Sequence, residues 1–166
     1  MNTHEMRSAA QRRFVVDHET LRRLIPHSGD MCLLAGVTYF DQDRIECLAT
    51  SHRALDHPLR AHGRLGAACG VEYAAQAMAV HGALPIVPSL APLPGALVGL
   101  RHVQFEVETL DLIESELVVV CRSLGRDAGA AMYDFRLEAD GALLLSGRAT
   151  VVFAHRPRPV DAEVPT

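Results

Sequence analysis

A lone glutamate, which can do acid–base chemistry, lies in a mostly apolar stretch, residues 64–84, whose other polar groups include Tyr73, Gln76 and His81. Glu72 and Gln76 are four positions apart, so they share one face of any helix that forms there. A carboxylate is costly to bury without a partner, and acids in apolar surroundings are typical of functional sites. We therefore expect Glu72 to be a catalytic group and Gln76 to bind substrate beside it. The structural alternative is that Glu72 lies at the helix surface or hydrogen-bonds to the backbone of a loop.

Histidines before this stretch are the natural partners of the carboxylate. His57 precedes Glu72 by 15 residues and His62 precedes it by 10. Imidazole titrates near neutrality, so we expect one of the two to serve as a general base; the alternative is that both are solvated loop residues. The spacing of five from His52 to His57 and from His57 to His62 does not form one helical face. We therefore expect no metal site, and no cofactor.

Small residues mark the predicted start of the helix at 64–84. Gly66, Ala67 and Gly70 leave the backbone there accessible. Free N–H groups at a helix start suit a carbonyl oxygen that gains negative charge during proton abstraction. We expect these three residues to bind substrate. The glycines can also serve to let the helix pack closely on the sheet, and the two interpretations are compatible.

The elements that must position these residues follow from the apolar pattern. Residues 64–84 are apolar on almost every face, which predicts a buried helix. A short helix is expected over 18–25, capped by Asp17 and ended by Pro26. The segments that read as strands are 31–40, 44–51, 97–107, 115–124, 130–138 and 142–154. Asp140-Gly141 predicts a hairpin turn, and the histidine-bearing segment 52–63 and the proline-rich segment 85–96 predict loops.

This order of elements predicts an α+β domain. An antiparallel sheet curled around one long buried helix is the hotdog fold. The sheet would cover only one side of that helix, so a second subunit is expected to cover the rest. We expect the domain to span 18–154, with an N-terminal extension at 1–17 and a disordered tail at 155–166.

Composition excludes several other classes of function. The 166 residues suit one domain. A net charge of −4, the absence of Trp and an aromatic content of 5% argue against nucleic-acid binding. No apolar run reaches the roughly 18 residues of a membrane span, and the N-terminus lacks a secretory signal. Four separated cysteines without a Cys-x-x-Cys pair indicate reduced thiols, so we expect a cytoplasmic protein without membrane contacts.

Three stretches resemble a known family. Residues 24–27 (Leu-Ile-Pro-His), followed by 31–34, are similar to its entry into the first strand, and residues 70–77 carry its helical Glu and Gln. Residues 98–105 and 140–149 look like its later strands. The chain thus resembles the hotdog-fold 3-hydroxyacyl-acyl carrier protein dehydratases of the FabZ type, and most of all the divergent dehydratase-like subunits of aryl polyene and related gene clusters.

The resemblance implies loss of water from a 3-hydroxyacyl thioester on acyl carrier protein or coenzyme A. In that family a histidine removes the α-proton, a carboxylate of the facing subunit helps expel the hydroxyl, and helix-start amides polarise the carbonyl. Glu72 matches the family's carboxylate, whereas the family's His-Phe-Pro-Gly motif is absent and His57 stands at nearly the same separation. The implied assembly is a homodimer or a heterodimer with another hotdog subunit.

Two other functions remain open on this sequence. The chain can be a catalytically weak hotdog subunit that binds acyl chains or completes a heterodimer with an active dehydratase. It can also be an acyl thioesterase, in which Glu72 would activate water.

Overall fold

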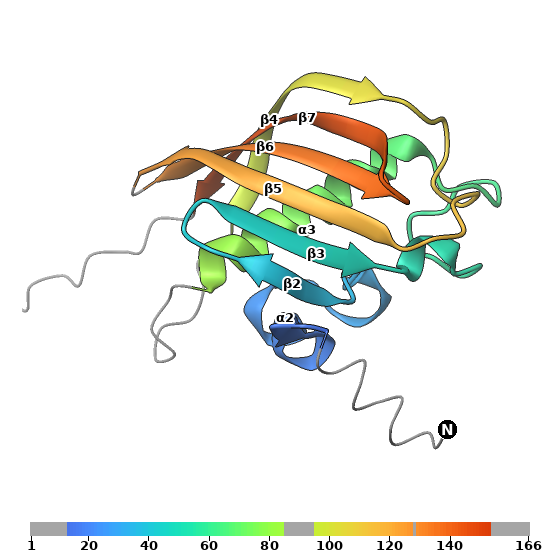
Figure 1. The fold of residues 1–166 in the computed structure, drawn as a ribbon, viewed down its shortest axis with the longest axis horizontal. Helices are drawn as coiled ribbons and strands as arrows, with labels where there is room; N and C mark the ends of the chain where they lie inside the picture. The colour runs from blue at the N-terminus through green and yellow to red at the C-terminus, as the bar shows by residue number, and fades with distance from the viewer. Residues whose placement is uncertain (1–12, 85–94, 128, 154–166) are drawn as a thin grey trace, which may run out of the picture.

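A seven-stranded antiparallel sheet wraps around one long helix in the computed structural model, which describes residues 13–84, 95–127 and 129–153 (Figure 1). The helices are α2 (His18–Leu24) and α3 (Gly70–Ala83), and short 3-10 turns cover Gly29–Met31, Ser51–Arg53 and Ala67–Cys69. The strands are β1 (Val16–Asp17), β2 (Gly36–Phe40), β3 (Arg44–Ala49), β4 (Gly95–Phe105), β5 (Leu117–Arg126), β6 (Ala130–Ala139) and β7 (Ala142–Phe153). Their order in the sheet is β1-β2-β3-β5-β6-β7-β4. The predicted α+β hotdog architecture is confirmed.

Helix α3 packs against the concave face of β3, β5 and β6 (Figure 1). Alternate residues of β5 and β6 face it and are buried, which is the pattern of strands with one covered face. On the helix, Tyr73, Ala74, Ala77 and Val80 are fully buried. The apolar sequence of the helix thus reflects a true core position.

Gly70 lets the first turn of α3 approach the sheet. A Cβ atom at this position would lie 2.4 Å from Leu145 Cδ2 and 3.1 Å from Leu137 Cδ2. Both leucine side chains are fully buried and have little room to move. Gly70 therefore has the packing role that was one of the two expectations for it.

We expect Gly70→Ala to lower the free energy of unfolding by about 1–3 kcal/mol, the usual cost of overpacking a core. Gly66→Ala is the matched control, because a Cβ there meets nothing within 4 Å. Urea unfolding followed by circular dichroism measures both changes. Equal stability of the two variants would show that the contact with Leu145 is accommodated at no cost.

Helix α2 forms as predicted. Its cap is Asp17, whose Oδ1 accepts a hydrogen bond from Thr20 N at 2.8 Å, and the helix ends at Leu24, just before Pro26. The chain before it is also part of the fold, since Val16 pairs with Val37 of β2 and Val15 N donates to Val37 O. Residues 15–17, part of the extension predicted at 1–17, thus pair with β2.

The strand predicted over 31–40 is shorter in the structure. Only Gly36–Phe40 joins the sheet, and Gly29–Met31 forms a 3-10 turn. Between them, Cys32 N donates to Gly29 O and Leu33 N donates to a side chain. Because these backbone groups bond locally and to side chains, the apolar residues 31–34 do not extend the strand.

The helix predicted over 64–84 begins at Gly70. Before it, Ala61 forms a bridge with Arg64 and Gly66 forms one with Thr109. Residues 65–69, Leu-Gly-Ala-Ala-Cys, are as apolar as the helix, but Gly66 is extended and Ala67–Cys69 forms a 3-10 turn, with Ala67 N donating to Glu108 O. Composition alone does not separate a buried extended segment from a buried helix.

The later strands form with end points shifted by a few residues. Asp140 and Gly141 make the expected turn and both have positive φ, 50° and 78°. All four cysteines are free thiols, and three of them are buried. Most of the loop predicted at 85–96 and the tail at 155–166 lie outside the described residues. Within the described part of the chain, neither helix is long and apolar enough to cross a membrane.

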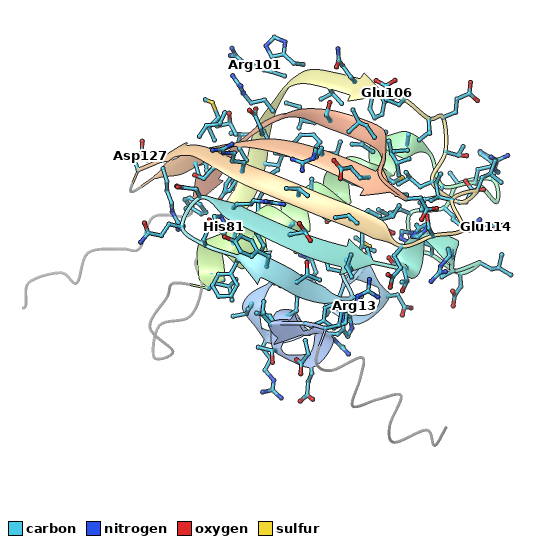
Figure 2. The ribbon with its side chains drawn as sticks, in the orientation of Figure 1. Arg13, His81, Arg101, Glu106, Glu114 and Asp127 are labelled. Carbon is cyan, nitrogen blue, oxygen red and sulfur yellow. The ribbon has the colours of Figure 1, made fainter. Side chains whose placement is uncertain are left out.

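Strand β4 lies at an edge of the sheet, where Figure 2 shows Arg101. Cross-strand neighbours share a face, and Leu97, Leu100 and Phe105 pair with core residues of β7. These three side chains therefore lie on the concave face, but they are 38%, 42% and 48% exposed. The described residues of the single chain leave this part of the concave face partly exposed.

Candidate active site

Glu72 and a histidine near the N-terminus form a close pair. Glu72 lies in the first turn of α3, and His27 lies directly after Pro26, which follows α2. His27 Nε2 is 3.0 Å from Glu72 Oε1, and each side chain is about one-third exposed, 30% and 32%. The two groups are thus close enough to share a proton and remain open to a ligand.

The pair lines an apolar cavity of about 620 Å³. Its floor is the face of α3 that carries Glu72, Ala75, Ala79 and Ala83, spaced three or four residues apart. From Glu72 to Ala83 this floor runs for about 16 Å at the helical rise of 1.5 Å per residue. The small side chains at Ala75, Ala79 and Ala83 leave room for the cavity along the helix.

The other walls come from segments far apart in the sequence. They consist of Arg23, Leu24, Ile25, Pro26 and His27 from α2 and its end, Gly95 and Leu97 from β4, and Val151 and Phe153 from β7. Arg126 and Asp127 complete the lining, and Figure 2 shows Asp127 at the tip of the β5–β6 hairpin. The guanidinium of Arg126 lies 4.8 Å from the centre of the Phe153 ring. A cavity lined mostly by apolar groups, with a few polar ones, is typical of a small-molecule site.

Gln76 is fully buried and holds the carboxylate of Glu72. Its Nε2 donates to Glu72 Oε1 at 3.1 Å and to Met31 O at 2.7 Å, which uses both amide hydrogens. Its Oε1 accepts from Leu33 N at 2.9 Å. The amide expected to bind substrate therefore fixes Glu72 and the segment before β2.

His57 lies in the core and contacts Tyr73, not Glu72. Its Nε2 is 3.0 Å from the Tyr73 hydroxyl, and its Nδ1 accepts from Leu59 N at 3.1 Å. Burial lowers the pKa of His57 below its usual 6.5, and nearby Arg60 acts in the same direction. Burial also disfavours the charged form of Tyr73 and raises its pKa to about 12. His57 is thus a neutral, hydrogen-bonded side chain near neutral pH.

His62 lies on the surface, in the turn that joins Ala61 to Arg64. It has a φ of 51°, and Gly63 follows with a φ of 75°. Ala61 and Arg64 exchange both backbone hydrogen bonds across this turn. Neither His62 nor His57 lines the cavity that contains Glu72.

The backbone N–H groups at the start of α3 are largely occupied. Ala67 N donates to Glu108 O at 2.9 Å, and the N–H of Gly70 bonds within the 3-10 turn. Gly66 and Ala67 line a separate hollow of about 500 Å³ beside residues 105–108. The structure therefore does not bring the three small residues predicted to bind substrate to the carboxylate.

His27 is the site residue that the sequence analysis did not propose. The signal was present, because Leu-Ile-Pro-His at 24–27 was one of the stretches that carried the family resemblance. Its contact with Glu72 depends on how the chain after α2 folds over α3, which residue spacing does not encode. Its Nδ1 is buried without a hydrogen-bond partner among the described residues.

A seven-stranded sheet wrapped around one long helix defines a hotdog-fold protein, and a carboxylate–imidazole pair lies in its cavity. The sequence profile of one dehydratase family, described as "ApeP-like: ApeP dehydratase", matches residues 19–161. The chain belongs to this ApeP-like dehydratase family. The resemblance to divergent hotdog dehydratases is thereby confirmed.

Solved structures share the fold. The dehydratase heterocomplex ApeI:P from Xenorhabdus doucetiae matches with a TM-score of 0.69 at 23% identity, covering 82% of this chain and 91% of that chain. A mutant thioesterase from Pseudomonas aeruginosa matches at 0.59 and 18% identity, covering 85% and 96%. A thioesterase from Haemophilus influenzae matches at 0.58 and 13%, covering 86% and 93%. A search of curated protein sequences gave no significant match.

Proposed function

We propose that the chain dehydrates 3-hydroxyacyl thioesters to 2-enoyl thioesters, with Glu72 and His27 as the acid–base pair. The observation that carries this proposal is the 3.0 Å contact between the two side chains in the wall of a long apolar cavity. Membership of a dehydratase family supports the reaction class. In this proposal the base and the acid that elimination requires are two adjacent side chains.

The hydrogen bonds to Glu72 support one division of roles in the proposed reaction. Oε1 faces both His27 and Gln76, so Oε2 is the oxygen available to substrate. The carboxylate takes the proton from C2 on Oε2, and the protonated imidazole of His27 gives its Nε2 proton to the C3 hydroxyl. The C3–O bond breaks, water leaves and the C2–C3 double bond forms. The proton on the carboxyl then passes to the imidazole and restores the pair.

This order reverses the roles implied by the family resemblance, in which the histidine is the base. It also uses two groups of one chain, whereas the resemblance implied a carboxylate from the facing subunit. The reason is geometric, because His27 Nε2 lies 3.0 Å from Glu72 Oε1 of the same chain.

The acyl chain of the proposed substrate lies along α3. Ala75, Ala79 and Ala83 leave room for it, and Leu97, Val151 and Phe153 supply apolar walls. Acyl carrier protein or coenzyme A carries the thioester in this proposal. Burial of the methylenes contributes roughly 0.8 kcal/mol each, so an apolar cavity favours long chains over short ones.

A second hotdog subunit is the proposed partner at β4. This edge strand exposes Leu97, Leu100 and Phe105 on the concave face, and edge strands readily pair with another chain. The related ApeI:P structure is a heterocomplex, which favours a heterodimer over a homodimer. The same open edge also favours the second candidate function, a binding subunit that completes an active dehydratase.

A substrate panel tests the proposal. We expect 3-hydroxyacyl thioesters, incubated with the chain alone and with a second hotdog subunit, to lose water and give enoyl thioesters detected by mass spectrometry. Release of free acid instead would identify a thioesterase. If turnover occurs only with the second subunit and survives the loss of Glu72, the chain is the binding subunit.

A further inference from the structure

We infer that His57, Tyr73 and Ser51 are positioning residues for Glu72, although none of their side chains hydrogen-bonds to Glu72 or His27. They hold Glu72 through a continuous chain of buried and partly buried hydrogen bonds that passes through Leu33 and Gln76. The inference rests on the proposed function in assigning Glu72 and His27 to catalysis, but the chain of contacts itself is independent of it.

The direction of each hydrogen bond follows from the first one. His57 Nδ1 accepts from Leu59 N, so in the neutral imidazole the proton lies on Nε2, which donates to the Tyr73 oxygen at 3.0 Å. The Tyr73 hydroxyl then donates to Ser51 Oγ at 2.8 Å. The Ser51 hydroxyl in turn donates to Leu33 O at 2.8 Å. Every member has a partner, so the chain has one consistent orientation.

Leu33 connects this chain to the carboxylate. Its carbonyl is held by Ser51, and its N–H is held by Gln76 Oε1 at 2.9 Å. Leu33 lies outside the regular strands, so side chains replace the bonds that a neighbouring strand would supply. Gln76 therefore keeps one orientation, in which its second N–H reaches Glu72 Oε1.

The consequence is a carboxylate held from two sides. Gln76 and His27 both contact Oε1, and the position of Gln76 depends on Leu33. Loss of the Tyr73 hydroxyl leaves Ser51 without its donor and loosens Leu33. A hydrogen bond of this kind contributes about 1 kcal/mol, and loosening Glu72 lowers the rate of the chemical step more than the affinity for substrate.

The same core contains a second tyrosine–histidine pair that has no such connection. His81 on α3, labelled in Figure 2, lies with Nδ1 3.1 Å from the Tyr133 hydroxyl and Nε2 2.8 Å from Asp41 O. Tyr133 and Tyr73 are both buried. No hydrogen bond among the described residues joins the Tyr133 pair to Gln76 or Glu72. Tyr133→Phe is therefore the matched control.

The experiment compares Tyr73→Phe with Tyr133→Phe in the full chain. We expect Tyr73→Phe to lower kcat for enoyl formation about tenfold with KM little changed, and to move the imidazole 15N resonances of His27 at fixed pH. Tyr133→Phe should leave kcat and the His27 resonances as in the wild type. Ser51→Ala, which breaks the chain one link further on, should reproduce the effect of Tyr73→Phe.

Two outcomes would overturn the inference. One is a Tyr73→Phe protein with wild-type kcat and unchanged His27 resonances, and the other is an equal effect of Tyr133→Phe, which would indicate a general core effect. If Tyr73→Phe does not fold, Ser51→Ala decides by the same measurements. If the wild type has no dehydratase activity, the proposed function fails, whereas the His27 resonances still test the inference.

Discussion

Glu72→Gln is expected to lower the rate of enoyl formation by about two to four decades, the usual effect of removing an acid–base group. The amide has nearly the shape of the carboxylate but neither accepts the C2 proton nor passes it to His27. We expect the fold to persist, because Gln76 can still hydrogen-bond the new side chain. Steady-state kinetics and thermal melts of the same preparation separate loss of chemistry from loss of structure.

Glu138→Gln is the control for that variant, since it also removes a partly exposed carboxylate, in this case one paired with Arg136 on β6. It should retain activity. Adding His27→Asn to Glu72→Gln should cost little more than Glu72→Gln alone, because the two groups act as one unit. Full turnover by Glu72→Gln would refute the assignment of the acid–base pair and leave the binding-subunit function.

Replacing Leu100 and Phe105 together by Asp is expected to abolish association with a second hotdog chain. Both side chains lie on the concave face of β4 and are nearly half exposed, 42% and 48%, in the single chain. Burying two carboxylates in an apolar interface leaves them without partners, and loss of one central apolar anchor alone costs about 2 kcal/mol or more. Light scattering at micromolar concentration measures the mass of the assembly.

Leu143→Asp is the control for the β4 variant. Leu143 is equally exposed, 40%, but it pairs with Glu138 and so lies on the convex face of the sheet. It should leave the assembly intact. A wild-type chain that stays monomeric, both alone and with a second hotdog subunit, would contradict the proposed interface.

Much of the fold was predictable because its elements have strong local signals. Asp17 and Pro26 bound α2, and the Asp140-Gly141 turn fixes the β6–β7 hairpin. The extended segments before α3 and before β2 were not predictable. Leu33 N donates to Gln76 Oε1 and Ala67 N donates to Glu108 O, and both acceptors are distant in sequence. Their apolar neighbours resemble those of a regular helix or strand.

One residue of the candidate site stands out in the sequence and the other does not. Glu72 is conspicuous because it is a carboxylate in an apolar helix. His27 and His57 cannot be ranked by spacing, since either can reach the helix only through a particular path of the chain. The structure separates them by their contacts: His27 lies at Glu72 in the cavity, and His57 lies in the core against Tyr73.

The Glu72–His27 pair comes from two segments of one chain. A shared site, built from one residue of each subunit, works only while both subunits keep their catalytic side chains. Loss of the residue in either sequence then inactivates the site. A self-contained pair removes that requirement. In the proposed complex with a different hotdog chain, this chain supplies both groups of the acid–base pair. Its partner can then lose its own catalytic side chains and still cover the edge of the sheet.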